Sequence, residues 1–157
     1  MKSIIVTCLI AACSFNAFAQ KNLLSYEDIK YLLHNNLNKA DTFLSAKGYK
    51  QQTVKSAAKN RKYTMAFPGG LNNEVNLRSD GKKIFVSIET NTQEQYNLVK
   101  NSIASFKVSS AAGPDTEAYD IKDLGNIYIV VGDNNIDPLK KDYDIQIVPN
   151  KNIAAIN

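Results

Sequence analysis

The chain has few of the residues on which most enzymes depend. Its 157 residues include two cysteines, Cys8 and Cys13, and one histidine, His34. Both cysteines precede residue 20, so the rest of the chain has no thiol nucleophile and no disulfide. A single histidine cannot provide the several His or Cys ligands that zinc usually takes. The chain also has no Gly-x-Ser-x-Gly element and no phosphate-binding glycine loop. We therefore expect neither catalytic residues nor a cofactor.

The chain also has no apolar run of membrane length, and its longest apolar run lies at the N-terminus. Residues 1–19, MKSIIVTCLIAACSFNAFA, combine Lys2, a short apolar run and the small-x-small triplet AFA. The run is shorter than the roughly 20 residues that cross a bilayer. This pattern predicts a secretory signal peptide that is cleaved after Ala19, and hence a periplasmic or secreted protein. The alternative is a lipoprotein anchored at Cys13, because IAAC resembles a short lipobox.

The remaining residues, 20–157, have the length of one domain, and we expect them to form a single α+β domain. A chain of this size can bury an ordinary hydrophobic core without disulfides. Because no second apolar run approaches membrane length, we expect membrane contact only through a lipid anchor or as a peripheral protein.

Charge is distributed unevenly along the chain. Residues 20–83 carry 12 basic and 5 acidic side chains, whereas residues 84–157 carry 6 and 10. Lys55, Lys59 and Arg61 belong to the steepest basic stretch and are candidate binding residues for an acidic protein partner or an anionic membrane surface. Alternatively, these cations keep an exposed strand edge from pairing with other chains. We expect no nucleic-acid partner, because the exported chain has no recognisable binding motif for one.

Two segments have the periodicity of amphipathic helices. Apolar residues recur at spacings of three and four over residues 26–47, which predicts one long helix with Ser25 as its N-cap. A second helix is predicted to begin at Thr92. The spacing from Thr92 to Gln95 is that of a capping box.

The other segments alternate between apolar and polar residues, as strands do. The clearest hairpin has Asp-Gly at positions 80–81 between two such runs. Residues 76–91 resemble residues 120–134, although generic hairpin chemistry could produce the same likeness. The predicted fold is therefore α+β, an antiparallel sheet with two helices on one face, built as two α-β-β repeat units.

Aromatic residues occupy equivalent places in the two similar segments. Phe85 and Tyr128 each alternate with strongly aliphatic neighbours. If the helices cover the aliphatic side of the sheet, Phe85, Tyr128 and Val130 lie on the other side, where aromatics suit the centre of a protein interface. The alternative is that the hairpins curl and bury both rings.

The segment GDNNIDPLKKDYD has the spacing of a calcium loop. Asp133, Asn135 and Asp137 stand two apart, and Asp144 falls at the twelfth place. However, Pro138 occupies the place of the glycine that makes the sharp turn, and the flanking runs are typical of strands rather than helices. We therefore treat these residues as weak metal candidates and expect a polar connection before the last strand.

Three classes of function fit these features. The first is a small exported interaction protein that is not an enzyme, such as a periplasmic inhibitor or a toxin-immunity protein acting through a sheet face. The second is a binder of an envelope lipid or another small apolar ligand, which requires an internal apolar pocket. The third is a carboxylate-based hydrolase, which requires two carboxyl groups that converge in a cleft.

Overall fold

The computed structural model describes residues 22–55, 58–108, 115–135 and 137–150, so the predicted signal peptide with Cys13 lies outside them. The fold is α+β, a seven-strand antiparallel sheet with three α-helices packed against it. The elements are α2 (Tyr26–His34), α3 (Leu37–Ala46), β1 (Lys50–Gln52), β2 (Asn60–Phe67), η1 (Pro68–Gly70), β3 (Leu71–Ser79), β4 (Ile84–Thr90), α4 (Gln93–Ile103), η2 (Ala104–Phe106), β5 (Thr116–Ile121), β6 (Gly125–Asp133) and β7 (Lys141–Pro149).

Two antiparallel meanders, β1–β4 and β5–β7, meet in the middle of the sheet. The strand order is β1-β2-β3-β4-β7-β6-β5, so β4 is central while β1 and β5 form the edges. The last strand of each meander joins the two halves, because β4 and β7 pair in antiparallel register from Val86 opposite Ile147 to Thr90 opposite Tyr143. Helix α4 connects the meanders along the chain.

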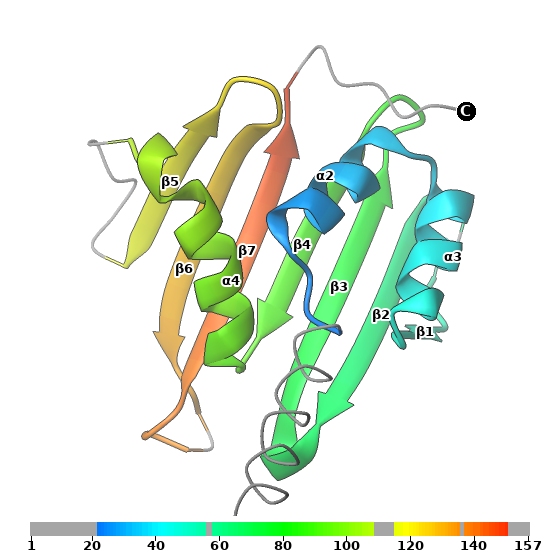
Figure 1. The fold of residues 1–157 in the computed structure, drawn as a ribbon. Helices are drawn as coiled ribbons and strands as arrows, with labels where there is room; N and C mark the ends of the chain where they lie inside the picture. Colours follow the sequence, from blue (N-terminus) through cyan, green and yellow to red (C-terminus); the bar gives the residue numbers. More distant parts are fainter. Residues whose placement is uncertain (1–21, 56–57, 109–114, 136, 151–157) are drawn as a thin grey trace, which may run out of the picture.

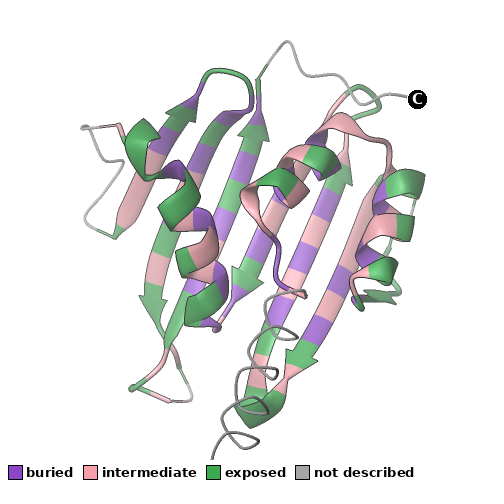
Figure 2. Cartoon of the chain, in the orientation of Figure 1, coloured by how far each residue is buried: buried purple, intermediate pink, exposed green. Residues whose placement is uncertain are grey.

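All three helices lie on one face of the sheet (Figure 1). Burial alternates along the strands, as expected for a sheet with one covered and one uncovered face (Figure 2). In β4 the aliphatic residues Ile84, Val86 and Ile88 are buried, which confirms the predicted aliphatic side. The core therefore lies between the helices and this side of the sheet. No helix in the described segments is both long and apolar enough to cross a membrane.

The prediction of one helix over 26–47 was wrong, because the chain breaks it into α2 and α3. Asn35 and Asn36 have extended backbones, with φ/ψ of −119°/162° and −78°/168°. The Asn36 side chain accepts a hydrogen bond from the Lys39 backbone N–H at 3.0 Å and so starts a new helix. Asparagine competes with helical hydrogen bonding in this way, and the sheet carries three helices instead of two.

The predicted N-caps have different outcomes. Ser25 caps α2 in a capping box with Asp28, whose carboxylate accepts from the Ser25 backbone N–H at 2.8 Å. Thr92 is the N-cap residue of α4, but its side chain makes no capping hydrogen bond. The predicted capping box with Gln95 was wrong, because the Gln95 amide binds the backbone of Leu24.

Candidate functional site

The face of the sheet opposite the helices, called the open face below, carries the aromatic residues singled out by the sequence. No element among the described residues lies over it (Figure 1). The pairing of the strands and the alternation of burial place these side chains on its central part: Glu74, Asn76 and Arg78 of β3; Phe85, Ser87 and Glu89 of β4; Asp142, Asp144, Gln146 and Val148 of β7; Tyr128 and Val130 of β6.

An apolar stripe of Phe85, Val148, Tyr128 and Val130 crosses β4, β7 and β6 on the open face. Phe85 and Val148 lie directly beyond the paired residues Val86 and Ile147, and Tyr128 lies opposite Gln146, which is two residues before Val148 on β7. Val130 and Val148 are 36% and 40% exposed, and both aromatic rings are half-buried rather than internal. The sequence reasoning missed Val148, although it alternates with buried Ile147.

Three carboxylates, the acidic row, lie side by side next to this stripe. Glu89 on β4 is the direct cross-strand partner of Glu74 on β3 and of Asp144 on β7. Like charges at directly opposite positions destabilise a sheet. Two neighbours partly compensate: Lys62 forms an ion pair with Glu74, and the Asn76 amide donates to both glutamates, at 3.1 Å and 3.3 Å.

Glu89, the middle member of the acidic row, has a raised pKa. Partial burial raises the pKa of Glu89, and the negative charges of Glu74 and Asp144 raise it further, against the opposing effect of Lys62. The three carboxylates line a shallow surface depression of about 420 Å³, and Val130 of the apolar stripe forms part of its wall. Carboxylates and an apolar side chain therefore face the same open space.

The predicted basic residues do not join the stripe. Lys55 and Lys59 are exposed in the connection between β1 and β2. Arg61 lies on the helix-covered side of β2, where its Nε is 3.4 Å from a carboxylate oxygen of Asp41 in α3. The structure therefore does not bring these three basic residues together with Phe85, Tyr128 and Val130.

The loop with calcium-like spacing is a turn closed by ion pairs. Asp133 pairs with Lys141, and Asp137 lies 3.5 Å from the Lys140 amine. Asn135 is exposed, and the Asp144 of this pattern belongs to the acidic row. No group of three or more His, Cys, Asp or Glu residues in the described part of the chain has the arrangement for a metal ion.

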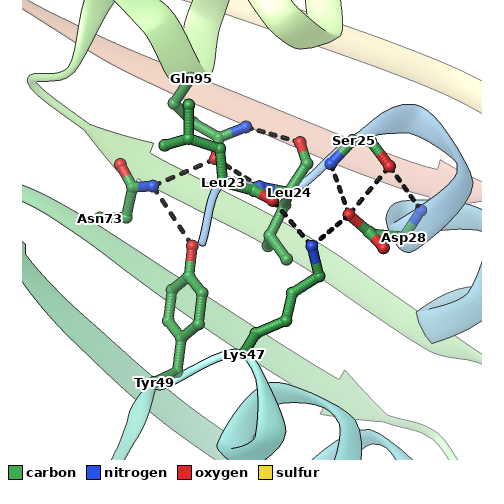
Figure 3. Close-up of polar contacts among 8 residues, drawn as sticks. All are labelled: Leu23, Leu24, Ser25, Asp28, Lys47, Tyr49, Asn73 and Gln95. Atoms are coloured by element: carbon green, nitrogen blue, oxygen red, sulfur yellow. Dashed lines mark hydrogen bonds and ion pairs between the residues drawn. The ribbon is translucent and has the colours of Figure 1, made fainter. Parts of the chain in front are cut away.

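A second polar constellation lies inside the protein, between the helices and the sheet (Figure 3). Gln95 of α4 and Asn73 of β3 are fully buried. The Asn73 amide donates to Gln95 Oε1 at 3.1 Å and to the Tyr49 hydroxyl at 3.2 Å. Burial raises the pKa of Tyr49 to about 12. The only sequence signal for this buried position is that Gln95 precedes Val99 by four residues, which places it on the apolar side of the helix.

No family model matches the chain, and neither a curated protein nor a solved structure matches it. The functional argument therefore starts from the arrangement of the residues. The structure brings Phe85, Tyr128 and Val130 onto the open face and adds the acidic row beside them.

Proposed function

We propose that this protein is a small exported binding protein without catalytic activity, and that its open face contacts a protein partner. The observation that carries this proposal is the apolar stripe beside the acidic row on the open face. Aromatic side chains are enriched in the centres of protein interfaces, where they contribute much of the binding energy. Phe85 lies on the central strand of the sheet and Tyr128 two strands away.

The acidic row indicates the chemistry of this partner. Its like charges lie in direct register at a cost in stability, and local rules of folding are most often broken at functional sites. A basic side chain of the partner would neutralise Glu89 and its neighbours while an adjacent apolar side chain contacts Val130. Complementary charges of this kind also accelerate association.

A periplasmic inhibitor or a toxin-immunity protein is the concrete form that fits the small size and the predicted signal peptide. Anchoring through Cys13 remains the alternative route to the same compartment. The depression on the open face is lined mostly by polar residues and opens to solvent, which supports a protein partner over an envelope lipid.

A carboxylate-based hydrolase is the second candidate, because Glu74 and Glu89 line one depression. A carboxyl group with a raised pKa beside a second carboxyl group is an arrangement that general acid catalysis uses. The shallow depression, which leaves a substrate in contact with water, favours the binding role.

We also propose that the two halves of the chain are repeats of one α-β-β unit. Each half has a helix followed by a meander, and residues 84–86 and 127–129 share the same alternation of burial. The halves differ in their helices, since the first carries α2 and α3 while the second carries α4.

The test is a pull-down from native extract with the mature chain, residues 20–157, at low and at high salt. We expect one protein to be recovered at low salt, less of it at high salt, and none with Phe85→Ser combined with Tyr128→Ser. The control is Tyr31→Ser on the helical side, where Tyr31 is 39% exposed. Equal recovery by the Phe85/Tyr128 variant would overturn the proposal, as would the absence of any partner at both salt concentrations.

A further inference from the structure

A short segment ahead of α2, Leu23–Ser25, is held inside the protein and is called the latch below. The Leu24 side chain is fully buried. Its backbone N–H donates to Gln95 Oε1 at 2.8 Å, and Gln95 Nε2 donates to the Leu24 carbonyl at 2.8 Å (Figure 3). One side-chain amide, 71 residues away, thus satisfies both backbone groups of a buried residue, as a neighbouring strand would.

The other end of the latch is held by the C-terminus of α3. The Lys47 amine donates to the Leu23 carbonyl at 2.9 Å and lies 2.7 Å from the Asp28 carboxylate. Asp28 also receives the Ser25 backbone N–H and hydroxyl, each at 2.8 Å. The latch therefore bridges α4 and the pair of helices that covers the first half of the sheet.

Gln95 and its neighbour Tyr96 connect the latch to strands β3 and β7 of the sheet. Its Oε1 accepts from Asn73 on β3, as described above. The next residue, Tyr96, stacks on Tyr143 of β7 with ring centroids 4.4 Å apart. Tyr143 stands between Asp142 and Asp144, which point to the open face.

We propose that the latch couples the N-terminal segment to α4. While the latch is bound to Gln95 it holds α4 against the sheet, and its release loosens α4 and β7 together. Release of the latch alone would take the Leu24 carbonyl away from Gln95 Nε2, while Gln95 Oε1 keeps its bond to Asn73. A buried donor that loses its partner in this way is costly. Because Gln95 belongs to α4, a movement of α4 that brings this amide to water removes the cost, so we expect the latch and α4 to open as one unit. This inference is independent of the proposed partner.

Native-state hydrogen exchange of the mature protein tests this coupling. We expect the Leu24 amide and the central amides of α4 to exchange with the same opening equilibrium, and the amides of β2 and β3 to exchange more slowly. Exchange of Leu24 about tenfold or more faster than α4 would show a latch that frays alone and would overturn the proposal.

Gln95→Glu supplies a variant whose latch depends on pH. The carboxyl group that this substitution introduces keeps one acceptor and one O–H donor when it is protonated, whereas its ionised form turns a carboxylate toward the Leu24 carbonyl. The titratable groups facing this site are Tyr49, which stays neutral below pH 10, and the Lys47–Asp28 ion pair. Burial favours the protonated form, so the latch should be secure at low pH and weaken as pH rises.

We expect exchange of Leu24 and α4 in this variant to accelerate together by about tenfold or more between pH 4 and pH 7, after correction for intrinsic exchange. The matched control, Gln93→Glu at an exposed position of α4, should follow the wild type. If the Gln95→Glu variant is unfolded at pH 7, Lys47→Met, which removes the bond to Leu23 and the ion pair with Asp28, should accelerate both sites in parallel. Acceleration of Leu24 without α4 in either variant would overturn the proposal.

Discussion

Glu74 on β3 and Glu89 on β4 are direct cross-strand partners on the open face, and the amide of Asn76 donates to a carboxylate oxygen of each. Two acids at opposed positions repel each other, and Asp144 on the far side of Glu89 adds a third negative charge. A folded protein that keeps this arrangement retains an unfavourable interaction which a cationic partner could relieve.

Glu89→Gln should stabilise the free protein at neutral pH. The folded protein raises the pKa of Glu89, so its protonated form is favoured and the associated stability is lost as pH rises through that folded pKa. Glutamine removes the charge and keeps an acceptor for Asn76. We expect a gain of up to about 1 kcal/mol in the free energy of unfolding at pH 7, measured by urea denaturation.

The gain should vanish near pH 3, where the Glu89 carboxyl group is protonated in both the folded and the unfolded protein. Asp120→Asn is the matched control, because Asp120 is exposed on edge strand β5. Equal gains from Glu89→Gln and Asp120→Asn at pH 7 would mean that the acidic row carries no repulsion of its own.

Gly125→Ala should be far more damaging than Gly132→Ala, although both glycines belong to β6. Gly125 has φ of +129°, and a Cβ there would lie 2.2 Å from the Val148 carbonyl oxygen. The backbone of β7 cannot yield without disturbing the apolar stripe. We expect a loss of more than about 3 kcal/mol in thermal or urea unfolding.

A Cβ at Gly132 would meet no described atom within 4 Å, and Gly132→Ala should change stability by less than about 0.5 kcal/mol. A similar cost for the two variants would contradict the close approach of β6 and β7 at Gly125.

Local patterns were sufficient to predict the hairpin of β3 and β4. The Asp-Gly turn and the alternation around Phe85 predicted β3, β4 and the side of each residue, because the side-chain period of a strand is two. The same alternation placed Phe85, Tyr128 and Val130 on one face. The break at Asn36 was not predicted, since its side chain outcompetes a continuous apolar periodicity.

Long-range pairing was not available from these patterns. The neighbouring positions of β4 and β7 bring Glu89 and Asp144 together, and no local signal reports which strand edges meet. Gln95 illustrates the same limit, because a partner three residues away was predicted and its partner lies 71 residues away. The acidic row and the latch therefore required the structure.

Millimolar calcium should leave the melting temperature unchanged. Asp133 and Asp137 are engaged with Lys141 and Lys140, and the turn is closed by the Lys140 N–H donating to the Asp137 carbonyl at 2.9 Å. A calcium ion would have to displace both lysines and rearrange a loop that contains Pro138. Differential scanning calorimetry with calcium, and with magnesium as the control, measures this. A rise of several degrees with calcium alone would contradict the ion-paired turn.

Tyr49→Phe should lower stability at pH 8 and lose that effect at high pH. The variant removes the acceptor of the Asn73 amide while Asn73 keeps its bond to Gln95, so we expect a cost of about 1 kcal/mol. Burial raises the pKa of Tyr49 to about 12, so the wild type is fully stabilised below the pKa of the unfolded tyrosine, near 10, and loses about 1.4 kcal/mol by pH 11 as the unfolded chain ionises. Phenylalanine has no such loss, and the two proteins should become equally stable near pH 11 in urea titrations.

Tyr31→Phe, at an exposed site, should show no such convergence. A constant difference between wild type and Tyr49→Phe across this range would mean that the Tyr49 hydroxyl is hydrated rather than enclosed beside Asn73.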